Sequence, residues 1–160
     1  MRFLTIISIL SAGCILLSCK SEKAKKYSDR IVKKENALGA DIEKETARLR
    51  VYFANYEYDS IASISSRMEN EITAVITEIQ NIPAPKLKEA ENFKDETLKY
   101  LTYKKNIFTT YKDYGMQTTP QGREMLRENM AMVLSQEKAM NYNLHAAQIN
   151  FARANHVKIK

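Results

Sequence analysis

The chain has 160 residues, of which 44% are hydrophobic and 28% are charged, and its formal net charge is +6. This length suffices for one folded domain and is short for two. Only two cysteines, two histidines and four glycines are present, which excludes disulfide-rich scaffolds and most clustered metal or nucleotide sites.

An apolar run occupies residues 3–17, behind a single positive charge at Arg2. Its length of roughly 15 residues is typical of a secretory signal peptide and falls short of the ~20 residues of a membrane-spanning helix. The run ends in Leu16-Leu17-Ser18-Cys19, which resembles the lipobox of bacterial lipoproteins. The resemblance implies cleavage after Ser18, a diacylglycerol thioether on Cys19 and acylation of the new amino group.

Cys14 is a second candidate for lipidation, because small residues also precede it. Ser11 stands where an aliphatic residue is wanted, however, and cleavage there would divide the apolar run. We therefore expect the lipid on Cys19; an ordinary secretory peptide or a transmembrane anchor is the alternative. No intrachain disulfide is then expected, since one cysteine leaves with the signal and the other carries the lipid.

Three segments follow from this prediction. Residues 1–18 form a lipoprotein signal peptide, residues 19–26 the lipidated cysteine with a basic tether, and residues 27–160 a helical domain. Positive charge is concentrated at residues 20–34, which either attract anionic head groups, at about 1 kcal/mol per Lys, or act as a solvated tether. Farther along, Lys and Glu are interspersed rather than striped, so no nucleic-acid partner is predicted.

The residue after the lipidated cysteine bears on the membrane that holds the protein. Lipoproteins retained at the inner membrane resemble one another in carrying Asp at this position, whereas this chain carries Lys20. We therefore expect the outer membrane, and both its periplasmic and its surface face stay open.

Four amphipathic helices are predicted after the lipidated cysteine, where only three glycines and three prolines interrupt the chain. The first runs from about 22 to about 53, with apolar residues spaced by fours and sevens. Gly39 lies inside it and indicates a bend or a close helix contact. The second starts with Asp59 or Ser60 as its N-cap. It ends near residues 81–85, because the two prolines there disfavour helix.

The third helix is predicted over about 87–115. The fourth begins after Thr119, which suits an N-cap, and has Pro120 at its first helical position. Its apolar seam continues to Phe151 and is interrupted by Glu137. Because such stripes are buried only when helices pack together, we expect an all-α fold. It is an antiparallel four-helix bundle with up-down-up-down topology, roughly 40 Å long; the alternative is an extended helical hairpin that dimerises.

Motifs for catalysis are missing from the sequence. There is no glycine-rich phosphate loop, no G-x-S-x-G, no H-E-x-x-H and no C-x-x-C-H. His145 and His156 lie roughly 16 Å apart along one helix, too far to share a metal ion. His145 is expected on the partly exposed flank beside Leu144. We therefore predict no catalytic residue, no metal and no cofactor, and a protein that is not an enzyme.

Glu137 is the most unusual polar residue, because it occupies a position on the apolar seam of the fourth helix. A buried carboxylate with a raised pKa would indicate a functional site. Alternatively, a straight helix drifts by ~20° per heptad, which turns one seam position outward. Lys34, Glu35, Glu45 and Lys104 interrupt the other seams in the same way. We favour the outward orientation for all five.

Methionines and tyrosines allow two interpretations each. Methionine is a soft ligand for copper or haem iron, but at helical spacing it is typical core filler; Met116, Met125 and Met132 fit a core least clearly. The nine tyrosines gather mainly at 52–58 and 100–114. Such clusters suit binding surfaces or bundle edges where the hydroxyl stays wet, and we favour edges.

Two segments of the chain, YSDRIVKKENAL and AAQINFARANHVKIK, resemble the opening and closing segments of a group of small helical bacterial surface lipoproteins of unknown function. The resemblance implies a lipid-anchored helical protein without an active site to carry over. We therefore expect a noncatalytic interaction or structural module of the cell envelope, anchored through Cys19 and bound to a protein partner. The alternative function is a helical bundle that binds a small ligand, haem or a metal.

Overall fold

The computed structural model describes residues 7–158, and from residue 20 onward also their side chains. The predicted cleavage site and the lipidation site at Cys19 lie outside the residues whose side chains are described. The described residues form five helices and no strand: α1 (Ile7–Ala54), α2 (Tyr58–Gln80), α3 (Ala90–Met116), α4 (Pro120–Ser135) and α5 (Glu137–Ala154).

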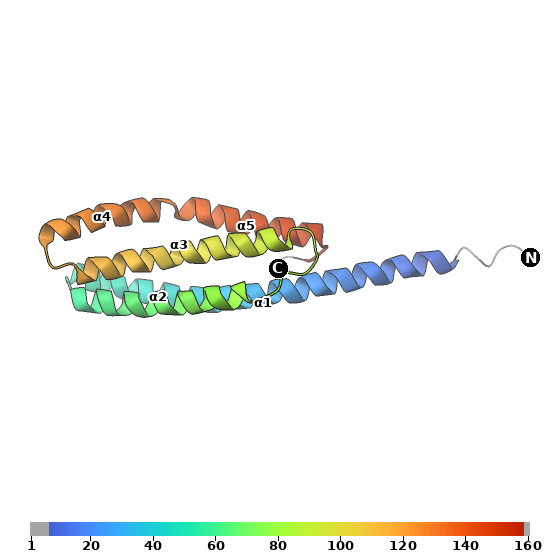
Figure 1. Cartoon of the computed structure of the whole chain (residues 1–160), viewed down its shortest axis with the longest axis horizontal. Helices are drawn as coiled ribbons and strands as arrows, with labels where there is room; N and C mark the ends of the chain where they lie inside the picture. The colour runs from blue at the N-terminus through green and yellow to red at the C-terminus, as the bar shows by residue number, and fades with distance from the viewer. Residues whose placement is uncertain (1–6, 159–160) are drawn as a thin grey trace, which may run out of the picture.

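The predicted all-α, antiparallel four-helix bundle is confirmed (Figure 1). Helices α1, α2 and α3 are three of its arms, and α4 with α5 forms the fourth. The N-terminal part of α1 projects beyond the other helices (Figure 1). Among the described residues, no helix carries an apolar stretch that is long enough to cross a membrane.

Packing along α1 reaches into the segment predicted as a tether. Ala24 is buried, and the Ser21 hydroxyl donates a hydrogen bond of 3.1 Å to the carbonyl of His156. The ordered bundle therefore extends at least as far as Ser21.

The core consists of the apolar seams that the helical spacing predicted. Its largest fully buried side chains are Ile31, Leu49, Ile61, Met68, Ile72, Ile79, Ile82, Phe93, Leu101, Phe108 and Phe151. An aromatic cluster joins three arms: Phe93 stacks on Phe151 with 5.4 Å between ring centroids, and Tyr27 meets Phe151 edge-on at 5.7 Å. The Tyr27 hydroxyl donates to the carbonyl of Ala90 at 3.1 Å, so α1, α3 and α5 are fixed to one another here.

Helix ends agree with the predictions in part. Thr119 is the N-cap of α4, since its hydroxyl accepts from the Gly122 amide at 3.1 Å, and Pro120 opens the helix. The N-cap predicted at Asp59 or Ser60 is wrong, because α2 already begins at Tyr58. Helix α3 begins at Ala90 rather than near 87, because a turn follows the prolines, closed by Leu87 donating to the Pro85 carbonyl at 2.7 Å.

The unbroken fourth helix predicted from the seam is wrong. At Gln136 the backbone amide donates three residues back, to Val133, at 3.1 Å, and this tighter bond separates α4 from α5. The neighbouring Ser135 hydroxyl donates to the Met132 carbonyl at 2.7 Å, and such side-chain bonds compete with the helical ladder and bend helices. Helix α4 contains no buried residue, whereas α5 buries four.

The outward orientation expected for the polar seam residues is wrong for Glu45 and Lys104, which are buried. Glu45 accepts from Arg48 at 3.0 Å and pairs with Arg67 of α2 at 3.1 Å. Lys104 pairs with Glu137 at 2.6 Å. A buried charge is tolerated only when a partner compensates it, and in both cases a partner comes from another helix. Lys34 and Glu35 are half-buried.

The close helix contact predicted at Gly39 is wrong, since a Cβ built there would meet no atom within 4 Å. The close approach is at Gly115, where a Cβ would lie 2.6 Å from the backbone nitrogen of Ala62. Helices α2 and α3 therefore touch backbone to backbone at this point.

The contributions of Glu35 and Glu69 to stability are expected to change with pH in opposite directions. Burial raises the pKa of Glu35, so its contribution opposes folding as pH rises above the unfolded pKa of about 4.5. A hydrogen bond from Lys112 lowers the pKa of Glu69, so its stabilising contribution is present above that pH and lost in acid. We expect Glu35→Gln to stabilise the protein at pH 7 and Glu69→Gln to destabilise it by about 0.5–1.5 kcal/mol.

Urea unfolding of both variants at pH 7 and pH 3.5 measures these effects. Both differences from the unsubstituted protein should shrink at the lower pH, because pH 3.5 lies below the unfolded pKa of about 4.5, where both contributions fade. A Glu35→Gln variant that is less stable at pH 7 would contradict the burial argument.

Candidate functional site

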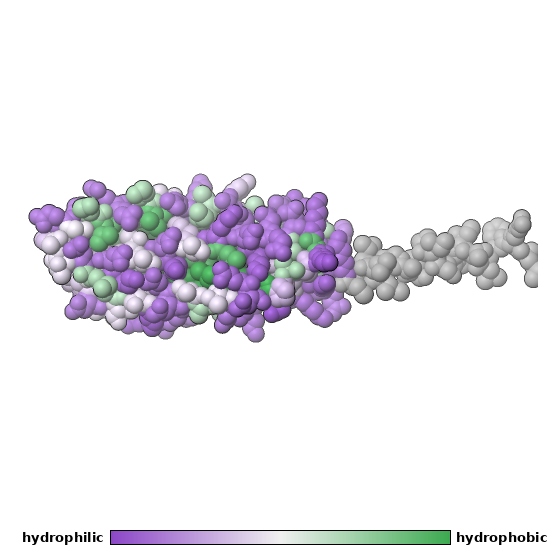
Figure 2. Space-filling view, viewed as in Figure 1, coloured by the Kyte–Doolittle hydropathy of each residue, from purple (hydrophilic) through white to green (hydrophobic). Residues whose placement is uncertain are grey.

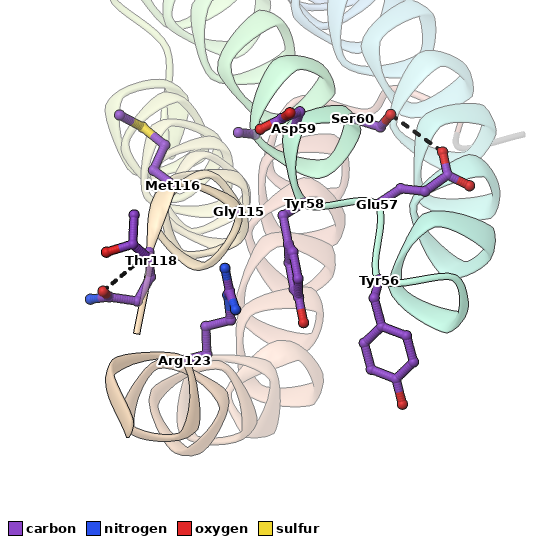
Figure 3. A pocket seen from close by; sticks show the side chains of 11 residues that line it. Tyr56, Glu57, Tyr58, Asp59, Ser60, Gly115, Met116, Thr118 and Arg123 are labelled. Atoms are coloured by element: carbon purple, nitrogen blue, oxygen red, sulfur yellow. Dashed lines mark hydrogen bonds between the residues drawn. The ribbon is translucent and has the colours of Figure 1, made fainter. Parts of the chain in front are cut away.

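The distal tip is the end of the bundle opposite the projecting part of α1 (Figure 1). It consists of residues 55–60, which connect α1 to α2 and begin α2, and residues 115–125, which end α3 and begin α4. A cavity of about 520 Å³ lies between these two connections (Figure 3). Its lining is contributed by Tyr56, Glu57, Tyr58, Asp59, Ser60, Ala62, Gly115, Met116, Gln117, Thr118 and Arg123.

Arg123 reaches into this cavity from α4 and lies against Tyr58 (Figure 3). The guanidinium carbon is 3.6 Å from the centroid of the Tyr58 ring. Within the described residues its Nε is buried without a hydrogen-bond partner, and no carboxylate lies within 4.0 Å of the group. A stacked guanidinium is held in one orientation and offers a planar fork of donors. Arg123 is therefore prepared to bind an acidic or carbonyl oxygen.

Tyr56 stands beside the cavity in a left-handed backbone conformation, with φ of 58°. The Glu57 amide donates to the Tyr52 carbonyl at 2.9 Å, which closes the C-terminus of α1 by the motif that usually places glycine at this position. A residue with a Cβ costs about 1–2 kcal/mol there. Tyr56 as a residue is nevertheless 68% exposed, so its burial offsets little of this cost.

The other wall of the cavity is fixed by Gln117. Its side-chain oxygen accepts from the backbone amides of Thr118 and Thr119 at 2.9 and 3.1 Å, so the α3–α4 connection has a defined shape. Met116 and Met125 are exposed at this end. Tyrosine, arginine and methionine are the residue types enriched at protein interfaces. The tip can therefore bind a partner through one polar anchor surrounded by adaptable apolar side chains.

The face of the molecule in Figure 2 shows no large hydrophobic patch. In Figure 2, hydrophobic residues are scattered in small patches among hydrophilic ones. Single exposed apolar residues are normal on soluble domains. The distal tip is distinguished by its stacked arginine rather than by hydrophobicity or by cavity volume, since cavities of about 490 and 560 Å³ lie elsewhere on the bundle.

The residues predicted as candidates lie elsewhere. Glu137 is 48% exposed at the start of α5 and pairs with Lys104. His145 is exposed on α5. His156 is also exposed and ends α5 in a left-handed conformation, with the Val157 amide donating to the Ala152 carbonyl at 2.9 Å. Within the part of the chain that the structure describes, no group of three or more His, Cys, Asp or Glu could hold a metal ion.

The methionines divide as their positions suggested. Met68 is buried and Met130 and Met140 are half-buried. Met116, Met125 and Met132, which fitted a core least clearly, are exposed.

Arg123 was not identified from the sequence. Its only signal there is a basic residue in the first turn of a predicted helix, where the partial positive charge of the helix N-terminus disfavours a cation. Tyr56 belongs to the cluster at 52–58, for which bundle edges were favoured; Tyr52 and Tyr58 are half-buried there, whereas Tyr56 is exposed.

No protein family, curated protein or solved structure matches the chain. The candidate site is therefore defined by the geometry of this chain alone.

Proposed function

We propose that this protein is a noncatalytic interaction module of the cell envelope, anchored by a lipid on Cys19 and docking a protein partner at its distal tip. The observation that carries the proposal is Arg123, stacked on Tyr58 and unpaired within the described residues. The partner presents an acidic or carbonyl oxygen to this guanidinium and apolar groups to the exposed Tyr56, Met116 and Met125. Burial of such a group by a partner makes it an energetic hot spot.

The membrane attachment is supported by the sequence. The lipobox-like Leu16-Leu17-Ser18-Cys19 ends an apolar run that is short for a membrane span, and Lys20 favours the outer membrane. A tip at the end of the bundle opposite the N-terminal part of α1 (Figure 1) then faces away from the membrane. A partner at this position is reached without approaching the lipid surface.

Replacement of each cysteine tests the anchor. In the native host, we expect Cys19→Ala to release the protein from the membrane fraction and Cys14→Ala to leave it there. Mass spectrometry of the unsubstituted protein should find the chain starting at Cys19 and carrying acyl chains. A free thiol on Cys19 with residues 1–18 still attached would overturn the anchor.

Replacement of Tyr56 by glycine tests the docking site and separates binding from folding. Glycine fits the left-handed conformation, so thermal unfolding should show unchanged stability or a gain of about 1 kcal/mol. In native envelopes, the yield of one defined crosslinked product should fall about tenfold, because truncation of a hot-spot residue costs more than about 1 kcal/mol of binding free energy.

The matched control is Tyr142→Ala, since Tyr142 is 73% exposed on α5, outside the tip. It should crosslink like the unsubstituted protein. Arg123→Gln should lower the yield of the same crosslinked product as Tyr56→Gly does. Unchanged crosslinking of both tip variants would rule out docking at the tip.

A further inference from the structure

A second concave site, here called the lateral groove, runs along α3 between α1 and the joint of α4 and α5. It consists of two adjoining cavities, of about 410 and about 350 Å³, which share Ile42 and Lys104 in their linings. Both volumes lie within the ~300–1,000 Å³ range of small-molecule sites. The lateral groove is separate from the distal tip, since none of the residues that line the tip cavity line either of these two.

The break at Gln136 lies beside the 350 Å³ cavity, since Leu134 and Glu137 on either side of it belong to the lining. Toward the end of the bundle from which α1 projects, α5 lies on α1 through the Tyr27–Phe151 contact at 5.7 Å and a hydrogen bond of 3.2 Å from Gln148 to Glu35. At the break, Leu134 is 39% exposed and still lines the 350 Å³ cavity. The joint of α4 and α5 therefore forms one side of the lateral groove.

Lys104 supplies the charge in the middle of the lateral groove. Its side chain is only 11% exposed, and its ammonium donates to the Glu137 carboxylate at 2.6 Å. The rings of Tyr100 and Tyr103 lie 5.3 and 5.7 Å from the ammonium. A cation with so little access to water needs an anion beside it. Glu137 is 48% exposed, so it can turn into water if another anion takes its place on Lys104.

The two cavities differ in the ligand group that they favour. The 350 Å³ cavity joins apolar side chains, among them Leu49, Phe53, Ile107, Phe108 and Leu134, to the two cations Arg50 and Lys104. The 410 Å³ cavity contains the carboxylates of Glu35 and Glu43, which repel an anion. An anionic head group is therefore best placed at Lys104, with an apolar chain extending into the 350 Å³ cavity.

We infer that the lateral groove binds a single-chain fatty acid, whose carboxylate replaces that of Glu137 on Lys104 and whose alkyl chain lies among Phe53, Phe108 and Leu134. The ion pair itself indicates the head group, because the site already holds one carboxylate at hydrogen-bond distance from Lys104. A neutral alcohol offers no anion to the ammonium, and a cationic amphiphile is repelled by it.

The test uses the lipidated protein in nanodiscs and a dodecanoate probe with a photoreactive group near the end of its chain. Saturable labelling should map to peptides that contain Phe53, Phe108 or Leu134. Lys104→Met should weaken labelling by about tenfold or more, because a hydrogen bond between charged groups is lost. Glu137→Gln should strengthen it by about threefold or more, because the competing carboxylate is removed. The opposite signs for the two partners of one ion pair distinguish head-group binding from general loosening of the bundle.

Lys138→Gln is the matched control, because Lys138 is exposed next to Glu137, and it should label like the unsubstituted protein. Unlabelled dodecanoate should compete with the probe, and dodecanol should not. If circular dichroism shows that Lys104→Met does not fold, the labelling of Glu137→Gln and the competition by dodecanol test the inference instead. Weaker labelling of Glu137→Gln, equal competition by dodecanol, or labelling of a folded Lys104→Met at the original affinity would overturn the inference. Tyr56→Gly should leave labelling unchanged, so the lateral groove and the distal tip are tested independently.

Discussion

Replacing Phe151 with alanine should lower the free energy of unfolding by about 3–5 kcal/mol, the usual cost of removing a fully buried phenylalanine ring. Phe151 is 1% exposed and stacks on Phe93 at 5.4 Å while meeting Tyr27 edge-on. These three rings belong to α5, α3 and α1. The cavity left by the substitution therefore loosens the contact that holds the end of the fourth arm to the bundle.

Chemical denaturation measures this loss, and the melting temperature should fall by roughly 10 °C, at about 2–4 °C for each kcal/mol in a chain of this size. The rate of backbone amide hydrogen exchange should increase more in α5 than in α2. Tyr142→Ala on the same helix is the control, and it should change stability by at most about 0.5 kcal/mol, since Tyr142 is 73% exposed. Equal stability of the two variants would contradict this description of the core.

Replacing Gly115 with alanine should destabilise the protein by about 1–3 kcal/mol or more, because the new methyl group overpacks a helix contact. Its Cβ would lie 2.6 Å from the backbone nitrogen of Ala62 and 2.7 Å from the carbonyl oxygen of Tyr58. Backbone atoms cannot turn aside as a flexible side chain can. Helices α2 and α3 must therefore separate at the distal tip, which also changes the cavity that holds Arg123.

Gly39→Ala is chemically the same change with the opposite expected sign. A Cβ at Gly39 would meet nothing within 4 Å, so alanine adds no clash inside α1. Its better helix propensity should stabilise the protein by about 0.5–1 kcal/mol. Thermal unfolding of the two variants side by side measures the difference, and a stable Gly115→Ala variant would show that α2 and α3 are farther apart than described.

The distal tip and the lateral groove are proposed to bind different kinds of ligand. Arg123 and Tyr56 form the surface that we propose for a protein partner, at the end opposite the N-terminal part of α1. Lys104 and Glu137 form the site that we infer for a fatty acid, in a groove on the side of the bundle. Helix α4 borders the tip and its last turn lines the lateral groove, and since it buries no residue, it is expected to open more readily than the other helices.

The arms of the bundle were predictable because the rules that set them are local. Ile61, Ile64, Met68, Ile72 and Ile79 recur at helical spacing and are all buried on α2. Proline removes an amide donor wherever it stands, so residues 83–85 separate two helices in any context. Thr119 caps α4 with its own side chain. Likewise, the prediction of a lipid on Cys19 depends only on neighbouring residues.

What the sequence by itself determined is thus the number of arms, most of their ends and the side of each helix that faces inward, because hydrogen bonding and helical spacing act over a few residues. Only the tertiary structure decided which polar residues are buried, because a buried charge requires a partner from elsewhere. Lys104 finds Glu137 33 positions away, and Glu45 finds Arg67 on the next helix. The stacking of Arg123 on Tyr58 has the same origin, because it joins α4 to α2. The break at Gln136 coincides with local bonds of Ser135 and Gln136, but a serine inside a helix more often leaves the helix intact, so the break was not predicted.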